Sequence, residues 1–548
     1  MSRKRAVRVC DFCHGHKVRC DLDVVGSPCS KCIELGEKCN VRTRKPYPER
    51  KRALRSVSKE SREQNEKSQS PRPGITHPEL VKIVQAAVPK PSSRIAPIFI
   101  EEGGYGDILN AVGKTTDRYF HIPASAEEAL APEDLEYLRI KGCFTLPENS
   151  RQLIEAYFQY VHPTFPVIDA EAFLQHYAAN GLEGINLLLL WSMFSISTSY
   201  VSASPQKAYK KMYASRAKLL FDLTPENDKI VLVQSALLLS FWFEDGEDVK
   251  QSWYWSSIAI GIAQTLGLHH STTTVATQTT AMQRSLWLNI WYCCMYRDVW
   301  LAFGMGRPLR IPASDHRSAS PKDLSPFNTR VVLDGEVLYS LDEAKGFNDA
   351  WMALISLTGT MHELMTKEKL APSRSEKLQA RLAMPSTNGA SSLLTRVQRH
   401  SQLHENAAIV AMGRKSGSKN VVMEAADRTT TIIQALLDDQ TSAYAAPIVI
   451  PLLVPAMVTY LHLFGDGNSV TSKSAKDKLF IYSQFLTALE ANYPAASILK
   501  GIFSAAQDAM LNEQGAKEGK DSKLTFVNQF VTDWSWHTND DLSWQTRA

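Results

Sequence analysis

The sequence has no apolar signal segment at its start, and this absence decides how its cysteines are interpreted. It begins Met1-Ser2-Arg3-Lys4-Arg5, and no hydrophobic region follows these residues. A disulfide framework needs an oxidising compartment, which a secretory signal would provide. We therefore expect cysteines in this chain to be free thiols or metal ligands rather than disulfides.

The sequence also lacks an uninterrupted apolar run of membrane-spanning length. Residues 443–464 contain no Asp, Glu, Lys or Arg, and a run this long can span a bilayer. However, Pro447, Pro451 and Pro455 interrupt it, and no cluster of Lys or Arg flanks it. We predict a buried, proline-started helix and no membrane partner; a membrane-anchored regulator is the competing interpretation.

Strand-like alternation and the Gly-x-Gly-x-x-Gly motif are both missing, whereas long helical patterns with aromatic residues on their apolar faces recur. These patterns cover 230–242, 253–268 and 282–302, and they predict a mainly α fold. No acidic or nucleophilic residue lies at a spacing typical of a catalytic site from His162 or from the His269-His270 pair. We therefore expect that the protein is not an enzyme. A ligand-sensing pocket among the aromatic helices fits better, although the sequence names no ligand.

Charge is distributed unevenly along the 548 residues. Residues 1–55 contain 15 Lys and Arg against 6 Asp and Glu, a net charge of +9, whereas the whole chain carries only +4. The body is therefore mildly acidic. We expect only the basic head to contact a polyanion.

Six of the nine cysteines lie in one stretch of thirty residues within this head. They form two Cys-x2-Cys pairs, each followed by one more cysteine: Cys10, Cys13, Cys20, Cys29, Cys32 and Cys39. Two tetrahedral zinc ions need eight ligand positions, which six thiolates can fill only if two sulfurs bridge both metals. The other three cysteines have no metal spacing, and we expect buried thiols: Cys143, Cys293 and Cys294.

With Pro28 before the fourth cysteine, the stretch resembles the fungal zinc binuclear cluster (Zn2Cys6) transcription factors. The resemblance implies two Zn²⁺ per chain, with Cys10 and Cys29 as the bridging ligands and the other four cysteines each holding one metal. It also implies a nuclear protein whose partner is double-stranded DNA with CGG-like triplets.

Three further segments resemble the fungal-specific transcription factor domain, or middle homology region. Residues 157–169 look like its opening signature, and residues 253–269 and 284–309 look like its later ones. With the cysteine stretch, the resemblance covers roughly 5–45 and 135–320. It implies a large helical regulatory domain behind the DNA-binding head.

The loop between the second and third cysteines is the expected DNA-reading element. The resemblance implies that Lys17 reads base edges, since Lys can donate to guanine, and that Arg19 holds phosphate or an adjacent base. His14 and His16 stand where many family members have Arg or Lys. Because an unperturbed histidine is mostly uncharged at neutral pH, these two residues attract DNA phosphates less strongly than Arg or Lys would. Further DNA contacts are expected from Arg8, Arg44 and Lys45.

The segment that follows the basic, proline-containing stretch 42–52 does not support a coiled coil. Leu54 and Val57 are the only apolar residues before a polar run through Ser70, and a stable coil needs three to four heptads. Either a homodimer forms through the body of the protein, or the factor binds as a monomer.

The expected organisation is a mainly α chain: a small Zn2Cys6 DNA-binding domain, a flexible linker and a large all-α regulatory domain. Its acid-and-aromatic C-terminal tail is typical of activation segments that bind transcriptional coactivators; a terminal helix docked on the core is the alternative. The predicted parts are DNA-binding domain 5–45, basic and polar linker 46–97 with at most one short helix near 78–88, and regulatory domain 98–548 with signatures in 151–320, a polar insertion at 371–423 and the tail at 526–548.

These features together predict a zinc-dependent, sequence-specific regulator of RNA polymerase II transcription in the nucleus, acting on metabolic or secondary-metabolite genes. The alternative is a zinc-containing protein-interaction regulator that does not bind DNA directly.

Overall fold

The computed structural model divides the chain into two compact units, residues 1–78 and 79–548. It describes residues 10–16, 18, 20–40, 96–99, 119–122, 130–201, 206–224, 228–242, 251–269, 281–315, 324, 326–367, 376, 391–465 and 469–515. The described residues of the first unit form three short helices, α1 (Asp11–Gly15), α2 (Leu22–Val25) and α3 (Ser30–Leu35).

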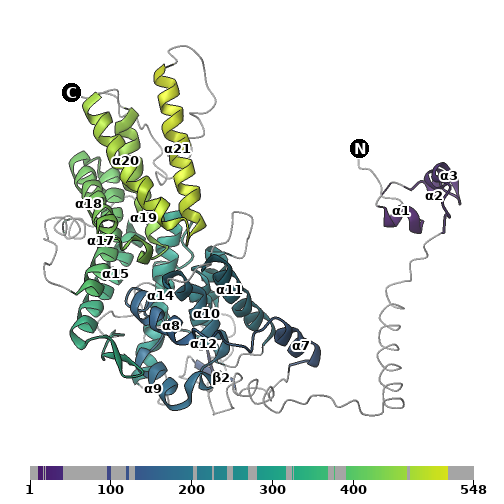
Figure 1. Cartoon of the computed structure of the whole chain (residues 1–548), viewed down its shortest axis with the longest axis horizontal. Coiled ribbons are helices and arrows are strands. Elements are labelled where there is room, and N and C mark those ends of the chain that lie inside the picture. The colour runs from purple at the N-terminus through teal and green to yellow at the C-terminus, as the bar shows by residue number, and fades with distance from the viewer. Residues whose placement is uncertain are drawn as a thin grey trace, which may run out of the picture. The chain divides into compact units, whose positions relative to one another are not determined.

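The second unit is built mainly from helices, as the sequence predicts (Figure 1). The first half comprises α7 (Pro132–Ile140), α8 (Ser150–Ala156), the π-helix η1 (Tyr157–Val161), α9 (Ala170–Asn180), η2 (Gly181–Gly184), α10 (Leu187–Ser197), η3 (Thr198–Tyr200), α11 (Gln206–Leu223), α12 (Lys229–Leu239), α13 (Ser252–Thr265) and α14 (Ala281–Met305). The second half comprises α15 (Leu341–Thr366), α17 (Ser392–Ser416), α18 (Lys419–Asp438), η8 (Ser442–Tyr444), α19 (Val449–Gly465), α20 (Ser469–Leu489) and α21 (Pro494–Gly515).

Helix α14 joins the two halves, because it packs against α12 and α13 of the first half and against α15 and α19 of the second. Figure 1 shows it between the two groups of helices. Two of its aromatic residues also form polar contacts with neighbouring helices. The indole N–H of Trp300 donates to the Thr358 hydroxyl over 3.0 Å, and the Tyr296 hydroxyl lies 3.0 Å from Nε2 of His404. All four side chains are buried. These pairs set the register of α14 against α15 and α17.

The proline-containing corner at 163–168 is held by side chains from distant elements. Nε2 of the buried His162 lies 3.0 Å from the carbonyl oxygen of Ile168. The Gln234 amide, on α12, donates to the Val167 carbonyl over 3.0 Å. A buried extended segment cannot satisfy its own carbonyls, so this corner depends on these partners.

Local features of the sequence explain where several helices begin and end. Pro132 opens α7, and the Asp169 side chain caps α9 by accepting from the backbone N–H of Ala172 over 3.0 Å. Gly267 and Gly306 have φ of +68° and +61° just beyond α13 and α14. The left-handed conformation suits glycine and ends a helix.

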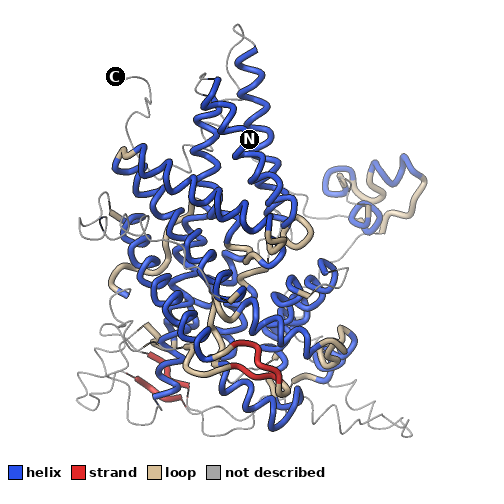
Figure 2. The backbone as a smooth tube through the Cα atoms, turned by 60° about the vertical axis from the view of Figure 1, so that its left-hand side comes forward, coloured by secondary structure: helices blue, strands red, loops and turns tan. Residues whose placement is uncertain are grey.

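Among the described residues, two short pairs of antiparallel strands depart from the all-α expectation (Figure 2). β1 (Ala96–Phe99) pairs with β2 (Tyr119–Ile122), and β3 (Val331–Leu333) pairs with β4 (Glu336–Tyr339). Asp334 and Gly335 connect β3 to β4 with φ of +50° and +85°, the signs that a tight hairpin turn needs at both central positions. The mainly α class is confirmed, but the sequence did not predict these strand pairs.

The predicted polar insertion at 371–423 is wrong where α17 begins. Val397, Leu403 and Ile409 of α17 are buried, so this polar-looking segment is a core helix. Its apolar residues occupy one face, and the Arg, Gln and Ser between them hid that pattern. The linker up to residue 95, the predicted helix at 78–88 and the tail at 526–548 lie outside the described residues.

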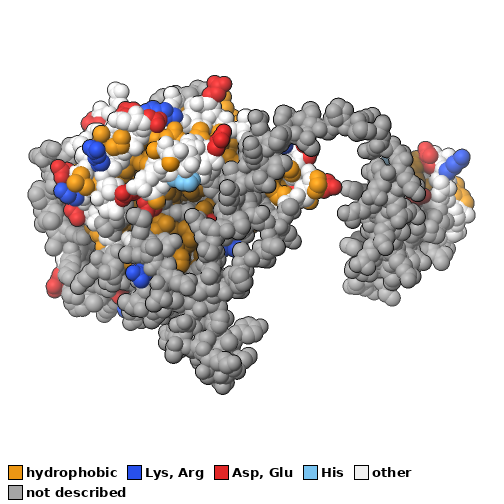
Figure 3. Space-filling view, turned by 90° about the horizontal axis from the view of Figure 1, so that it is seen from below, with side chains coloured by type: hydrophobic (Ala, Val, Ile, Leu, Met, Phe, Trp, Pro, Cys, Tyr) orange, Lys and Arg blue, Asp and Glu red, His pale blue; other side chains and the backbone are white. Residues whose placement is uncertain are grey.

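The uncharged run is a buried helix, as expected. α19 carries it, with Leu453 and Tyr460 fully buried, and no described helix is long and apolar enough to cross a membrane. On the face shown in Figure 3, acidic and basic side chains are interspersed with hydrophobic ones over the described surface of this unit. On this face, the mixture differs from the continuous basic patch that attracts a polyanion.

Candidate metal centre

The six cysteines of the first unit form two groups of four that share two members. Cys10 and Cys29 belong to both groups. Cys13 and Cys20 complete one group, Cys32 and Cys39 the other, and within each group the sulfur atoms lie within 4.8 Å of one another. The structure thus brings together all six predicted ligands, with the shared pair that the resemblance implied.

The sulfur–sulfur distances fit zinc. Sγ of Cys10 lies 3.8 Å from that of Cys29, 3.7 Å from that of Cys32 and 3.9 Å from that of Cys20. Sγ of Cys13 lies 3.7 Å from that of Cys29. A tetrahedron with Zn–S bonds of about 2.3 Å has edges of about 3.8 Å. The residues present therefore fit two zinc ions with two shared thiolates.

Backbone N–H groups and short helices hold the sulfurs in place. The N–H of Cys13 donates to Sγ of Cys10 over 3.3 Å, and the N–H of Cys29 donates to Sγ of Cys39 over 3.2 Å. Hydrogen bonds to sulfur favour the thiolate form. Gly36, with φ of +69°, ends α3 and turns the chain toward the last cysteine.

Burial acts against ionisation of these thiols. Desolvation raises the pKa of the Cys13 and Cys32 thiols, whereas the hydrogen bond from the Cys29 N–H lowers the pKa of Cys39. Cations between the sulfurs offset the desolvation cost, and their binding releases the thiol protons. The cluster is thus chemically suited to bind a soft divalent metal.

The structure describes few of the predicted DNA-contacting residues. His16 is exposed, and its ring lies 4.5 Å from the ring of Phe12, between centroids. His14 belongs to α1, but its side chain is not described. The basic residues lie outside the described residues: Arg8, Lys17, Arg19, Arg44 and Lys45.

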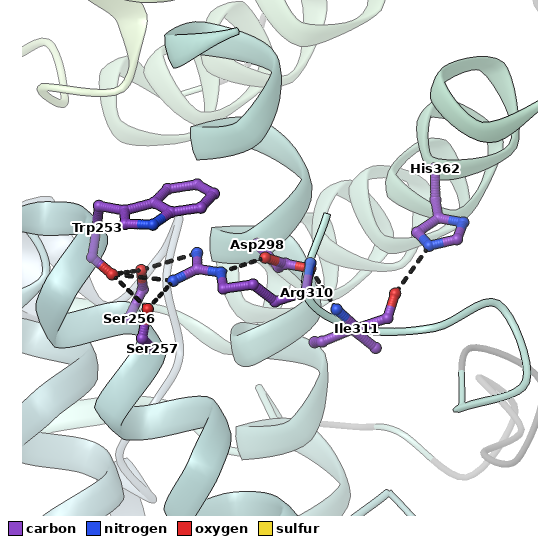
Figure 4. Close-up of polar contacts among 7 residues, drawn as sticks. All are labelled: Trp253, Ser256, Ser257, Asp298, Arg310, Ile311 and His362. Atoms are coloured by element: carbon purple, nitrogen blue, oxygen red, sulfur yellow. Dashed lines mark hydrogen bonds and ion pairs between the residues drawn. The ribbon is translucent and has the colours of Figure 1, made fainter. Parts of the chain in front are cut away.

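Figure 4 shows a polar network beside α14 that the sequence did not indicate. The Asp298 carboxylate, fully buried on α14, accepts from Nε of Arg310 over 2.8 Å and from the backbone N–H of Ile311 over 2.9 Å. The Arg310 guanidinium also donates to the Trp253 carbonyl over 2.9 Å and lies 3.7 Å from the Trp253 ring centroid. Nε2 of His362, on α15, lies 3.1 Å from the Ile311 carbonyl oxygen. The network therefore ties the chain after α14 to α13 and α15.

The cysteine geometry defines the first unit as a binuclear zinc-cluster module, and the second unit is a large helical region. Two family models match the chain in the same places. Residues 8–48 match the fungal Zn(2)-Cys(6) binuclear cluster domain, and residues 154–402 match the fungal specific transcription factor domain. The chain belongs to the fungal Zn2Cys6 transcription factors, a family of regulators rather than enzymes, whose cluster binds two zinc ions through six cysteines.

Curated relatives agree with this assignment. The chain is 29% identical to cutinase transcription factor 1 beta of Fusarium vanettenii, over 61% of this chain and 46% of that protein. It is 30% identical to cutinase transcription factor 1 alpha of the same fungus, over 57% and 41%. It is 24% identical to the acetamidase regulatory protein of Aspergillus fumigatus, over 62% and 55%. The matched region thus spans about half the length of these relatives.

Among solved structures, the K. lactis CBF3 core aligns with 73% of this chain and 94% of its own, at 12% identity and a TM-score of 0.46. A likeness this distant carries no inference about function.

Proposed function

We propose that the protein is a nuclear, zinc-dependent regulator of RNA polymerase II transcription, and that its cluster module reads CGG-like triplets in double-stranded DNA. The observation that carries this proposal is the pair of four-sulfur groups sharing Cys10 and Cys29. A cage of this kind stiffens the short chain between its ligands, which is the segment that holds Lys17. Lysine on a rigid loop can donate to the two acceptors on a guanine edge.

The relatives support a role in metabolic gene control. Their names refer to a cutinase and an acetamidase, and we extend only the class, regulation of metabolic or secondary-metabolite genes, to this chain. Binding as a homodimer and recruitment of coactivators by the C-terminal tail are further parts of the proposal.

The test compares two lysines of the module in the full-length, zinc-loaded protein. Lys17→Met should cost about 1–3 kcal/mol of DNA-binding free energy and relax the base preference. Lys31→Met is the matched control, because Lys31 pairs with Glu34 over 2.7 Å on α3 and should leave base preference unchanged. The measurement is selection from a random DNA pool followed by binding titrations. An equal loss on all sequences would reassign Lys17 to a phosphate contact.

A protein-interaction module that does not bind DNA is the second candidate. It is favoured by exposed apolar side chains on this small unit, since Val25 and Ile33 are 56% and 62% exposed. Salt dependence separates the two, because each phosphate contact contributes about −0.9 to the slope of log K against log [salt]. A flat slope, or no binding to any duplex, would favour the second candidate.

A further inference from the structure

A cavity of about 230 Å³ lies within the second unit, among α11, α14, α19 and α21. Its walls are mostly aliphatic: Leu301, Ile448, Ile450, Val454, Leu499 and Ile502. Ile498, which is 46% exposed, also lines it, so the cavity reaches the surface there. We call this space the buried-cation cavity, because two cationic side chains are part of its lining.

Lys210 of α11 is the first of these cations. Its side chain lines the cavity although the residue is only 8% exposed. Nζ donates to the Ser199 hydroxyl over 3.0 Å and lies 4.7 Å from the ring centroid of Tyr493. An ammonium group has three donors, and no acceptor for the other two is found among the described residues. Burial lowers the pKa of Lys210 to about 7.

Arg297 of α14 is the second cation. It is 2% exposed, and its Nε donates to the Ser240 hydroxyl over 2.8 Å. Its guanidinium lies 4.0 Å from the ring centroid of Phe241, which also lines the cavity. Burial lowers the pKa of Arg297 to about 9. Two desolvated basic groups therefore share one apolar space, and the Lys210 amine is close to its pKa at neutral pH.

Within the described part of the chain, no carboxylate compensates either cation. The neighbouring Asp298 is paired instead with Arg310. The first turns of α19 and α21 also line the cavity, through Ile450 and Ala495, and helix N-termini carry partial positive charge. An isolated buried charge is costly, so this arrangement is suited to a bound anion.

We propose that the buried-cation cavity binds a small amphipathic monocarboxylate, with its carboxylate on Lys210 or Arg297 and its aliphatic or aromatic body against the apolar walls. At about 30 Å³ for each water-sized group, the volume holds roughly eight such groups. A chain of about six carbons therefore fits. The proposal concerns the regulatory region alone and does not depend on DNA reading.

The experiment is calorimetric titration of the full-length, zinc-loaded protein, without DNA. The probes are butanoate, pentanoate and hexanoate, each compared with its matching primary alcohol. We expect at least one acid to bind with a Kd below about 1 mM and its alcohol to bind at least about tenfold more weakly. No acid binding at that level, or equal binding of acid and alcohol, would overturn the proposal.

Two variants test the residues. Lys210→Met should weaken acid binding at least about tenfold, equivalent to about 1.4 kcal/mol, and leave alcohol binding unchanged. The matched control is Lys476→Met on α20, where the side chain is exposed. Ala495→Leu, which adds volume at the lining, should weaken acid and alcohol alike. Unchanged acid affinity in both Lys210→Met and Ala495→Leu would refute the site, and the second variant remains informative if the first does not fold.

Discussion

Replacing Cys29 by alanine tests the shared-sulfur arrangement of the metal centre. Sγ of Cys29 lies 3.8 Å from that of Cys10 and 3.7 Å from that of Cys13, and the residue belongs to both four-sulfur groups. Its removal leaves each group with three sulfurs. Alanine offers no replacement ligand, so neither metal would keep a complete tetrahedral shell.

The expected loss is large compared with the stability of so small a module. Structural zinc contributes an apparent binding free energy of about 10–16 kcal/mol in zinc-finger peptides at neutral pH. Besides cysteines, Leu22 is the only buried hydrophobic residue among the described residues of this cluster. Apolar packing therefore cannot replace the metals, and we expect the module of Cys29→Ala to unfold.

The assay is native mass spectrometry of the full-length protein, with zinc counted per chain. We expect two zinc ions in the parent and none in Cys29→Ala. Cys32→Ala is the matched control, because Cys32 belongs to one group only and its loss should leave one complete shell. Two zinc ions retained by Cys29→Ala, or equal losses in the two variants, would refute the shared-sulfur reasoning.

Two further predictions concern the helical unit. Arg310→Met leaves the fully buried Asp298 carboxylate without its cation and should lower the free energy of unfolding by about 3–5 kcal/mol; Arg399→Met breaks a 2.6 Å pair with the half-exposed Asp439 and should cost under about 1 kcal/mol. Similar decreases in the free energy of urea unfolding for Arg310→Met and Arg399→Met would contradict this difference between the buried and the exposed ion pair. Burial lowers the pKa of His162 to about 4, whereas the pKa of a histidine in an unfolded chain is about 6.5. The contribution of neutral His162 to stability is therefore complete above about pH 6.5 and is lost as the pH falls toward 4. The loss is at most about 1.4 kcal/mol per pH unit. The free energy of unfolding of His162→Gln should therefore fall less between pH 7 and 5 than that of the parent protein. Equal falls in the two proteins would contradict the role of His162.

Features that depend on neighbouring residues can be predicted from the sequence. Pro132 and Asp169 start helices, and Gly267 and Gly306 end them, because caps and left-handed positions are decided within a turn of the chain. The cysteine cluster was predictable for the same reason, since its ligands lie within thirty residues.

Contacts between distant residues could not be predicted in this way. Asp298 and Arg310 are both ordinary charged residues in the sequence, and only the packing of the chain after α14 against α13 brings them together. Helix α17 was missed because its buried residues are interspersed with Arg, Gln and Ser. The average composition of the segment is polar, although one face of the helix is apolar.

Arg297 of the buried-cation cavity differs from Arg310 in the partners of its guanidinium group. Partly buried arginines in this fold have different partners: Arg310 is paired with the Asp298 carboxylate, whereas Arg414 donates to the Pro455 carbonyl and the Thr459 hydroxyl. Arg297 is the residue immediately before that aspartate, yet among the described residues it contacts a serine and an aromatic ring rather than an acid. Hydrogen bonds to the hydroxyl and the carbonyl of Ser240 offset only part of the cost of burying this charge. Departures from good packing are expected at functional sites, and an anion that enters the cavity would compensate this one.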